Sequence, residues 1–159
     1  MQLSDIGMVA SDTSRSRAYL QAMARSEILP NYVLVLEDLS EQLLPGQLDK
    51  SQAAYENEWL VETDECWSET QFDSTQPIKV LLDKLGIFYE VSTSKNINDT
   101  SVVEAIRRRP ENVFVYSGFG GVLLRKDVLS IGKHFLHVHG GYLPDYKGST
   151  TNYYSLIVD

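Results

Sequence analysis

Two histidines near the end of the sequence have the residue type and the spacing for proton transfer. His137 and His139 are two positions apart, and on an extended chain residues at this spacing project to the same side. Gly140 and Gly141 follow, so the backbone there can turn sharply or approach a ligand closely. Imidazoles beside a glycine-lined cleft can donate and accept protons near neutral pH. The pattern indicates a candidate catalytic site.

Two other interpretations of the histidine pair stay open at this point. Both imidazoles could be hydrogen-bonded groups of a sheet edge without a chemical role. A metal site would need a third ligand, and no nearby Asp, Glu or Cys completes a convincing set, so we expect no metal. The glycines of residues 118–121 also suggest a nucleotide loop. That fingerprint requires Gly-x-Gly-x-x-Gly directly after the first strand, and here the third glycine is missing.

Strands and helices are expected to alternate along the chain. Short apolar segments predict strands at 6–11, 32–36, 87–91, 113–116 and 134–138. Segments with helical spacing of apolar residues predict helices at 16–28, 78–85, 102–109 and 124–131. Such alternation is typical of parallel βαβ units. The expected fold class is α/β, a Rossmann-like open, mostly parallel sheet with helices on both faces.

The expected fold also predicts where a ligand would bind. In open α/β sheets, ligands bind outside the carboxyl ends of the strands. Three loops should meet there, at 11–14, 117–121 and 139–148. Residues 12–14 are expected to cap the first helix, and backbone N–H groups at such a helix start could alternatively hold an anionic group. Ser101 and Glu104 have the spacing of a capping box.

Composition and charge limit the function classes. The chain has 159 residues, of which 43% are hydrophobic and 23% charged, and its net charge is −8. These values fit one globular domain over 1–159, with the polar and acidic segment 39–77 as a probable insertion. The acidic balance disfavours DNA as a partner, and the apolar runs are too short to cross a membrane. A single cysteine, Cys66, fits a cytoplasmic protein.

The segment around the histidines resembles a family signature. Residues 137–148 read His-Val-His-Gly-Gly-Tyr-Leu-Pro-Asp-Tyr-Lys-Gly, and the 10-formyltetrahydrofolate-dependent formyltransferases usually carry Asn-x-His-Pro-Ser-x-Leu-Pro-x-Tyr-Arg-Gly. Residues 113–123 resemble the strand and loop that hold the pterin ring in that family, often ending Gly-Phe-x-x-Ile-Leu. Gly118-Phe119 and Val122-Leu123 correspond. The two matches lie in the family's order, one helix apart.

The resemblance implies an enzyme that moves a formyl group from 10-formyltetrahydrofolate to an amine. It places the catalytic histidine at His139, and it places the asparagine that hydrogen-bonds the formyl oxygen at His137. The donor folate is then expected to contact Tyr116, Phe119, Gly121, Val122, Leu123 and Gly141. The implied acceptor is a small-molecule amine such as an amino sugar or an amino acid. A homodimer is one expected assembly.

Three departures from the family pattern qualify this expectation. His137 stands where the family has asparagine, Gly141 where it has serine, and Gly121 where an arginine is common. The sequence also ends at Asp159, before the position of an aspartate that the family needs. We therefore expect a domain incomplete at its C-terminus. A non-catalytic, truncated folate- or nucleotide-binding module is the alternative, and a hydrolase that releases formate is a third.

Overall fold

Five parallel strands form the sheet in the computed structural model, which describes residues 2–37, 72–73 and 75–139. The strands are β1 (Gln2–Ser11), β2 (Leu29–Leu36), β3 (Phe88–Val91), β4 (Val113–Ser117) and β5 (His134–Leu136). They lie in the order β3-β2-β1-β4-β5, and each neighbouring pair is parallel. The expected Rossmann-like α/β class is confirmed.

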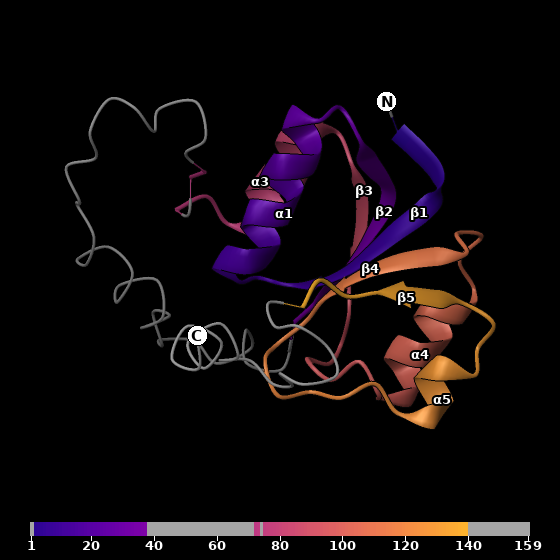
Figure 1. Ribbon diagram of the computed structural model, residues 1–159. Helices are drawn as coiled ribbons and strands as arrows, with labels where there is room; N and C mark the ends of the chain where they lie inside the picture. The colour runs from indigo at the N-terminus through magenta and orange to yellow at the C-terminus, as the bar shows by residue number, and fades with distance from the viewer. Residues whose placement is uncertain (1, 38–71, 74, 140–159) are drawn as a thin grey trace, which may run out of the picture.

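Helices cover both faces of this sheet (Figure 1). One face carries α1 (Ser14–Arg25) and α3 (Ile78–Leu85), and the other carries α4 (Thr100–Arg107) and α5 (Lys126–Leu129). Each face has its own apolar layer. The central strand β1 serves both, because Met8 and Ala10 belong to the α1 and α3 layer whereas Val9 belongs to the other. This arrangement explains why residues 7–11, the second half of β1, are buried on both sides of the sheet.

The order of the strands creates a topological switch point between β1 and β4. The chain runs from β1 outward through β2 to β3 and then returns to place β4 on the opposite side of β1. The loops that follow β1 and β4 therefore leave the sheet in different directions. Ligands of open α/β sheets bind at such a switch point, which is where the sequence predicts the site.

Several element boundaries differ from the prediction. Pro30 lies inside β2, where it faces Leu3 at an irregular point of the pairing with β1, a place that tolerates a residue without an N–H. The predicted helix at 124–131 is a single turn, α5. The predicted capping box is wrong, because Asp99 is the N-cap residue of α4 and the Ser101 hydroxyl lies 3.3 Å from Thr93 Oγ1.

The fifth strand is shorter than predicted and ends at Leu136. Its last pairing joins Leu136 to Val115. One residue further along β4, the carbonyl oxygen of Tyr116 lies 3.1 Å from the ring Nδ1 of His137. The His137 side chain, and not the backbone of β5, therefore contacts the Tyr116 carbonyl just beyond the last β4–β5 pair. Both His137 and His139 consequently lie beyond the strand.

A buried ion pair closes the amino end of the sheet. Glu111 is fully buried, and Arg109 donates two hydrogen bonds of 3.0 Å to its carboxylate. Asn31 Nδ2 donates a third, at 2.9 Å. The Arg109 guanidinium also lies 3.9 Å from the centre of the Tyr32 ring. These contacts connect the segment after α4 to the start of β2.

Glu111→Gln should make the free energy of unfolding depend less on pH in the acid range. Burial acts to raise the pKa of Glu111, but the hydrogen bonds from Arg109 and Asn31 outweigh it and lower this pKa below the ordinary 4.5. Because the pKa of Glu111 is lower in the folded than in the unfolded protein, its carboxylate stabilises the fold at pH values above the unfolded-state pKa. That stabilisation is lost as the pH falls through the folded-state pKa. We expect Glu111→Gln to lower the unfolding free energy at pH 7 by about 1 kcal/mol.

Urea denaturation of the parent and of Glu111→Gln at pH 7 and at several values below 4.5 measures this effect. The gap between the two proteins should shrink as the pH falls. A gap that stays constant with pH would show that the carboxylate charge of Glu111 contributes nothing.

Candidate functional site

The candidate site lies where the carboxyl ends of β1 and β4 meet. Ala10 and Ser117 form the last pair of these strands, and α1 begins directly after β1. Thr13 is the N-cap residue of α1, and its side chain accepts a hydrogen bond from Ser16 N at 3.2 Å, as predicted from residues 12–14. The side chain of Ser11 is fully buried, and its Oγ has no hydrogen-bond partner among the residues that the structure describes. The first two predicted loops are therefore neighbours.

Side chains of the first turn of α1 hold the loop that follows β4. Arg15 donates hydrogen bonds to Ser117 Oγ at 3.3 Å and to the carbonyl of Gly118. Ser16 Oγ donates to the carbonyl of Ser117 at 2.9 Å. No role for Arg15 or Ser16 was expected from the sequence. Their position in the helix turn next to a predicted ligand loop was the only available signal.

The two predicted catalytic histidines are brought together. The ring centres of His137 and His139 are 6.3 Å apart with an interplanar angle of 49°. His137 is exposed and His139 is half-buried, so neither imidazole ring is sealed inside the core. The ring of Tyr116 lies 6.0 Å from that of His137. Three of the predicted site residues thus form one group at the carboxyl edge of β4 and β5.

The contact between His137 and Tyr116 determines what this imidazole can do. A carbonyl oxygen only accepts hydrogen bonds, so the 3.1 Å contact requires that Nδ1 of His137 carries a proton. In the neutral ring the other nitrogen, Nε2, is then an acceptor. His137 can donate from Nε2 only as the imidazolium. The expected hydrogen bond to a formyl oxygen is therefore restricted to the protonated form of His137.

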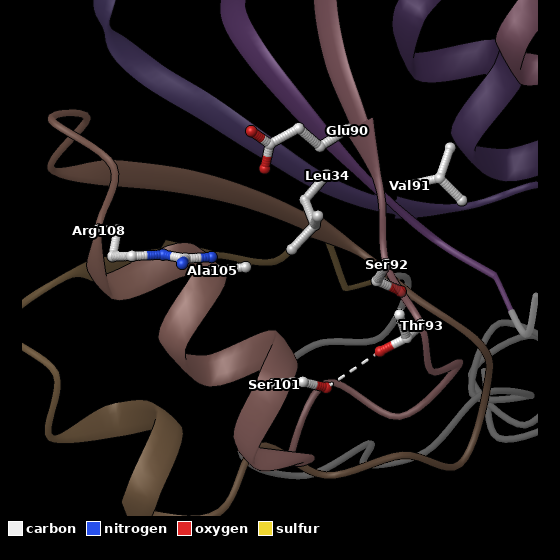
Figure 2. A pocket seen from close by; sticks show the side chains of 8 residues that line it. All are labelled: Leu34, Glu90, Val91, Ser92, Thr93, Ser101, Ala105 and Arg108. Carbon is white, nitrogen blue, oxygen red and sulfur yellow. Dashed lines mark hydrogen bonds between the residues drawn. The ribbon is translucent and has the colours of Figure 1, made fainter.

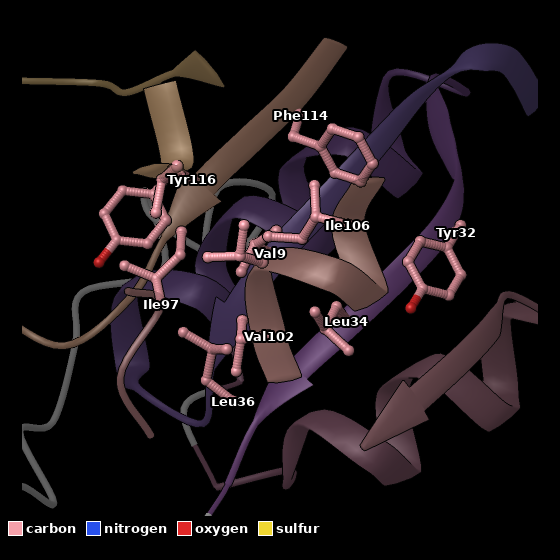
Figure 3. Packing of buried hydrophobic residues seen from close by; sticks show 11 residues of the cluster. Val9, Tyr32, Leu34, Leu36, Ile97, Val102, Ile106, Phe114 and Tyr116 are labelled. Atoms are coloured by element: carbon pink, nitrogen blue, oxygen red, sulfur yellow. The ribbon is translucent and has the colours of Figure 1, made fainter. Parts of the chain in front are cut away.

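Tyr116, the penultimate residue of β4, carries a buried hydroxyl. Its side chain is 5% exposed, and its Oη has no hydrogen-bond partner among the described residues. Burial raises the pKa of Tyr116, and the positive charge of Arg15 opposes this only in part. The hydroxyl lies against Gly118, because a Cβ built on that glycine would be 2.4 Å from Oη. Figure 3 shows Tyr116 at one side of the labelled core residues, with Tyr32 at the other.

Hydrogen bonds with Asn98 fix the end of the turn at 118–123, and the turn presents apolar side chains. Asn98 Nδ2 donates to the carbonyl of Leu123 at 2.9 Å, and Asn98 Oδ1 accepts from Arg125 N at 2.8 Å. Phe119 is 36% exposed and Leu123 is 82% exposed, whereas Val122 packs against the core. The turn thus offers a polar backbone flanked by apolar surface, which suits a flat ring.

Two of the predicted folate contacts are glycines, Gly121 and Gly141, and the structure describes only the first. Gly121 has a φ of 80°, a backbone conformation that favours glycine. The arginine common in the family would therefore be strained at this position. Gly141 lies outside the residues that the structure describes, as do the rest of the loop at 140–148 and the larger part of the expected insertion.

A hollow of about 220 Å³ lies at the other edge of the sheet, between β3 and α4 (Figure 2). Hydroxyl groups line one end of it, and a carboxylate and a guanidinium lie towards the other. Its lining residues are Leu34, Glu90, Val91, Ser92, Thr93, Ser101, Ala105 and Arg108. No predicted site residue is among them, so this hollow is separate from the histidine corner.

The described ranges 2–37, 72–73 and 75–139 contain no group of three or more His, Cys, Asp or Glu side chains placed to hold a metal ion. Within these ranges, every helix is too short or too polar to span a membrane.

Comparisons with known proteins support the architecture. The sequence matches no family model and no curated protein. Its structure is similar to the crystal structure of phosphoribosylglycinamide formyltransferase from Anaplasma phagocytophilum, with 13% sequence identity and a TM-score of 0.54. The similarity covers 99% of this chain and 58% of that chain, so the chain spans less than two thirds of the length of its structural neighbour. At this level of identity the likeness shows a shared formyltransferase-like fold.

Proposed function

We propose that this chain carries the formyl-donor side of a formyltransferase site, using 10-formyltetrahydrofolate as donor and a small amine as acceptor. The observation that carries the proposal is the corner formed by His137, His139 and Tyr116 beside the 118–123 turn. It occurs at the switch point of a fold shared with a known formyltransferase. Ligand sites of this type combine apolar walls with a few directed polar groups, and the corner has both.

The chemistry requires one proton acceptor and one oxygen-stabilising group. The acceptor nitrogen forms a bond to the formyl carbon, the bond from that carbon to the folate nitrogen breaks, and the proton that the amine loses passes to the departing folate nitrogen. His139 would take this proton as a general base, a role that contributes typically 10²–10⁴-fold. The His137 imidazolium would donate from Nε2 to the formyl oxygen as negative charge builds there, which is worth about 3 kcal/mol of barrier.

The donor's ring system would lie on the 118–123 turn. Phe119 and Leu123 supply exposed apolar surface, and the backbone of the turn supplies hydrogen-bonding groups. Arg15 and Asn98 hold this backbone in place, so the turn is organised before a ligand arrives. The resemblance does not identify the amine, and an amino sugar, an amino acid and other small amines all fit the proposal.

Incubating the chain with 10-formyltetrahydrofolate and a panel of amines tests the proposal. Mass spectrometry would detect a formylated amine, and a coupled assay would detect formate. We expect formylated product that depends on both substrates. Formate in the absence of any amine would instead identify a hydrolase, and folate binding without turnover would identify a binding module. Absence of both binding and turnover would refute the proposal.

A further inference from the structure

We infer that the hollow between β3 and α4 is a binding site for a free α-amino acid with a short polar side chain. The hollow lies far from the histidine corner in the fold, because β3 is an outer strand and both β2 and β1 separate it from β4. The inference is therefore independent of the proposed function.

Two opposite charges line the hollow without forming an ion pair. The carboxylate of Glu90 and the guanidinium of Arg108 lie on the same side of it (Figure 2), and no ion pair joins either group to another described residue. Arg109, whose charge also attracts Glu90, is already bound to Glu111. Glu90 would repel a simple anion and Arg108 would repel a simple cation. The two groups together therefore favour a ligand that carries both charges.

The Glu90 carboxylate is held in place before a ligand binds. Its Oε2 accepts a hydrogen bond of 2.9 Å from the hydroxyl of Tyr32, which is fully buried. Its Oε1 has no hydrogen bond to another described residue, so it is available to an ammonium group. Arg108 is the C-cap residue of α4, and its guanidinium can bind a carboxylate through two parallel hydrogen bonds. These two groups are complementary to the ammonium and the carboxylate of one amino acid.

Hydroxyl groups at the opposite end of the hollow suit a polar side chain. Thr93 Oγ1 and Ser101 Oγ lie 3.3 Å apart, and both residues are exposed, so each hydroxyl can form a further hydrogen bond with a ligand. The hydroxyl of Ser92 is already used, because it donates to the carbonyl of Ser94 and accepts from the N–H groups of Ser94 and Glu37. We therefore expect the side chain of the ligand to end in a hydroxyl or an amide.

The size and the remaining lining of the hollow exclude larger ligands. Its volume of about 220 Å³ is below the roughly 300–1,000 Å³ of pockets for drug-sized molecules, so a nucleotide is too large. Leu34, Val91 and Ala105 supply its apolar surface, and none of its lining residues is aromatic. It therefore offers no ring on which a sugar or a base could stack. An amino acid fits the volume as well as the charges.

Titration of the full-length chain with L-glutamine, followed by NMR of the backbone amides, tests the inference. We expect saturable shifts of the signals from β3, residues 92–93 and α4, with a Kd on the order of 1 mM. Two analogues each lack one charge of the probe: 4-carbamoylbutanoic acid lacks the ammonium, and 4-aminobutanamide lacks the carboxylate. Each should bind at least about 10-fold more weakly, because hydrogen bonds between charged groups are lost. L-leucine, which has an apolar side chain, should also bind more weakly.

Substitutions in the lining locate the site. Glu90→Gln and Arg108→Gln should each raise the Kd for L-glutamine at least about 10-fold. Arg107→Gln is the matched control, because Arg107 is an exposed arginine of α4 that is bound to Glu104 and does not line the hollow; this variant should keep the parent Kd. Ala105→Leu would fill the hollow while leaving both charges in place, and it should abolish saturable binding. Thermal midpoints show whether each variant is folded.

Four results would overturn the inference. The first is a parent protein whose signals do not approach saturation at about 10 mM L-glutamine, roughly ten times the expected Kd. The second is equal binding of L-glutamine and either single-charge analogue, and the third is equal binding of L-leucine. The fourth is an Arg107→Gln variant that loses as much affinity as Arg108→Gln, which would show general attraction to the charge of α4. None of these results bears on formyl transfer at the histidine corner.

Discussion

Replacing His139 by alanine should lower the rate of formyl transfer by at least about 100-fold. His139 lies beside His137 at the carboxyl edge of β5 and is half-buried, and it is the proposed acceptor of the proton that leaves the amine. Alanine cannot take this proton, so kcat should fall. The KM for the donor should change little, because the turn that would hold the folate ring is organised by Arg15 and Asn98.

His134→Ala is the matched control for this experiment. His134 is exposed and stands at the opposite, amino end of β5, so removing its imidazole should leave kcat and KM as in the parent. Thermal midpoints of both variants would confirm that each protein is folded. If His139→Ala retained the parent kcat, His139 would have no part in the chemistry. An equal loss in both variants would point to a general disturbance of β5.

Local sequence patterns were sufficient to predict the architecture. Apolar segments of strand length alternate with helical segments, and their order along the chain determines which strands can pair. The helix over 78–85 begins and ends as predicted, because Gly86 interrupts the apolar spacing directly after it. The carboxyl edge of the sheet follows from the same alternation. The predicted meeting of the loops after β1 and β4 is confirmed by the pairing of Ala10 with Ser117 and by the hydrogen bonds from Arg15.

The contacts that shape the corner could not be predicted, because they join residues far apart in the sequence. Arg15 and Ser117 are separated by 102 positions, and nothing in the local pattern around either residue indicates the other. The contact of His137 with the Tyr116 carbonyl depends on where the β4–β5 ladder stops. The capping box failed for a local reason, because Asp99 is the N-cap residue of α4 and the Ser101 hydroxyl meets Thr93 instead.

Gly118→Ala should be among the most disruptive single-methyl changes in this corner. A Cβ at Gly118 would lie 2.4 Å from Tyr116 Oη and 2.6 Å from the ring, well inside van der Waals contact. The ring is buried in the core layer on the α4 side, so it cannot simply swing into solvent. We expect the unfolding free energy to fall by about 2–3 kcal/mol. Affinity for the proposed donor, 10-formyltetrahydrofolate, should fall as well, because the backbone that Arg15 holds must shift.

Gly120→Ala provides the control, because nothing lies within 4 Å of a Cβ at that position; it should cost well under about 1 kcal/mol. A double-mutant cycle then identifies the cause. In a Tyr116→Leu background the hydroxyl and the outer ring are gone, so Gly118→Ala should cost at least about 1 kcal/mol less than it does in the parent. An equal cost in both backgrounds would show that the Tyr116 ring is not what excludes a side chain at position 118. The glycine would then serve the backbone conformation of the turn itself.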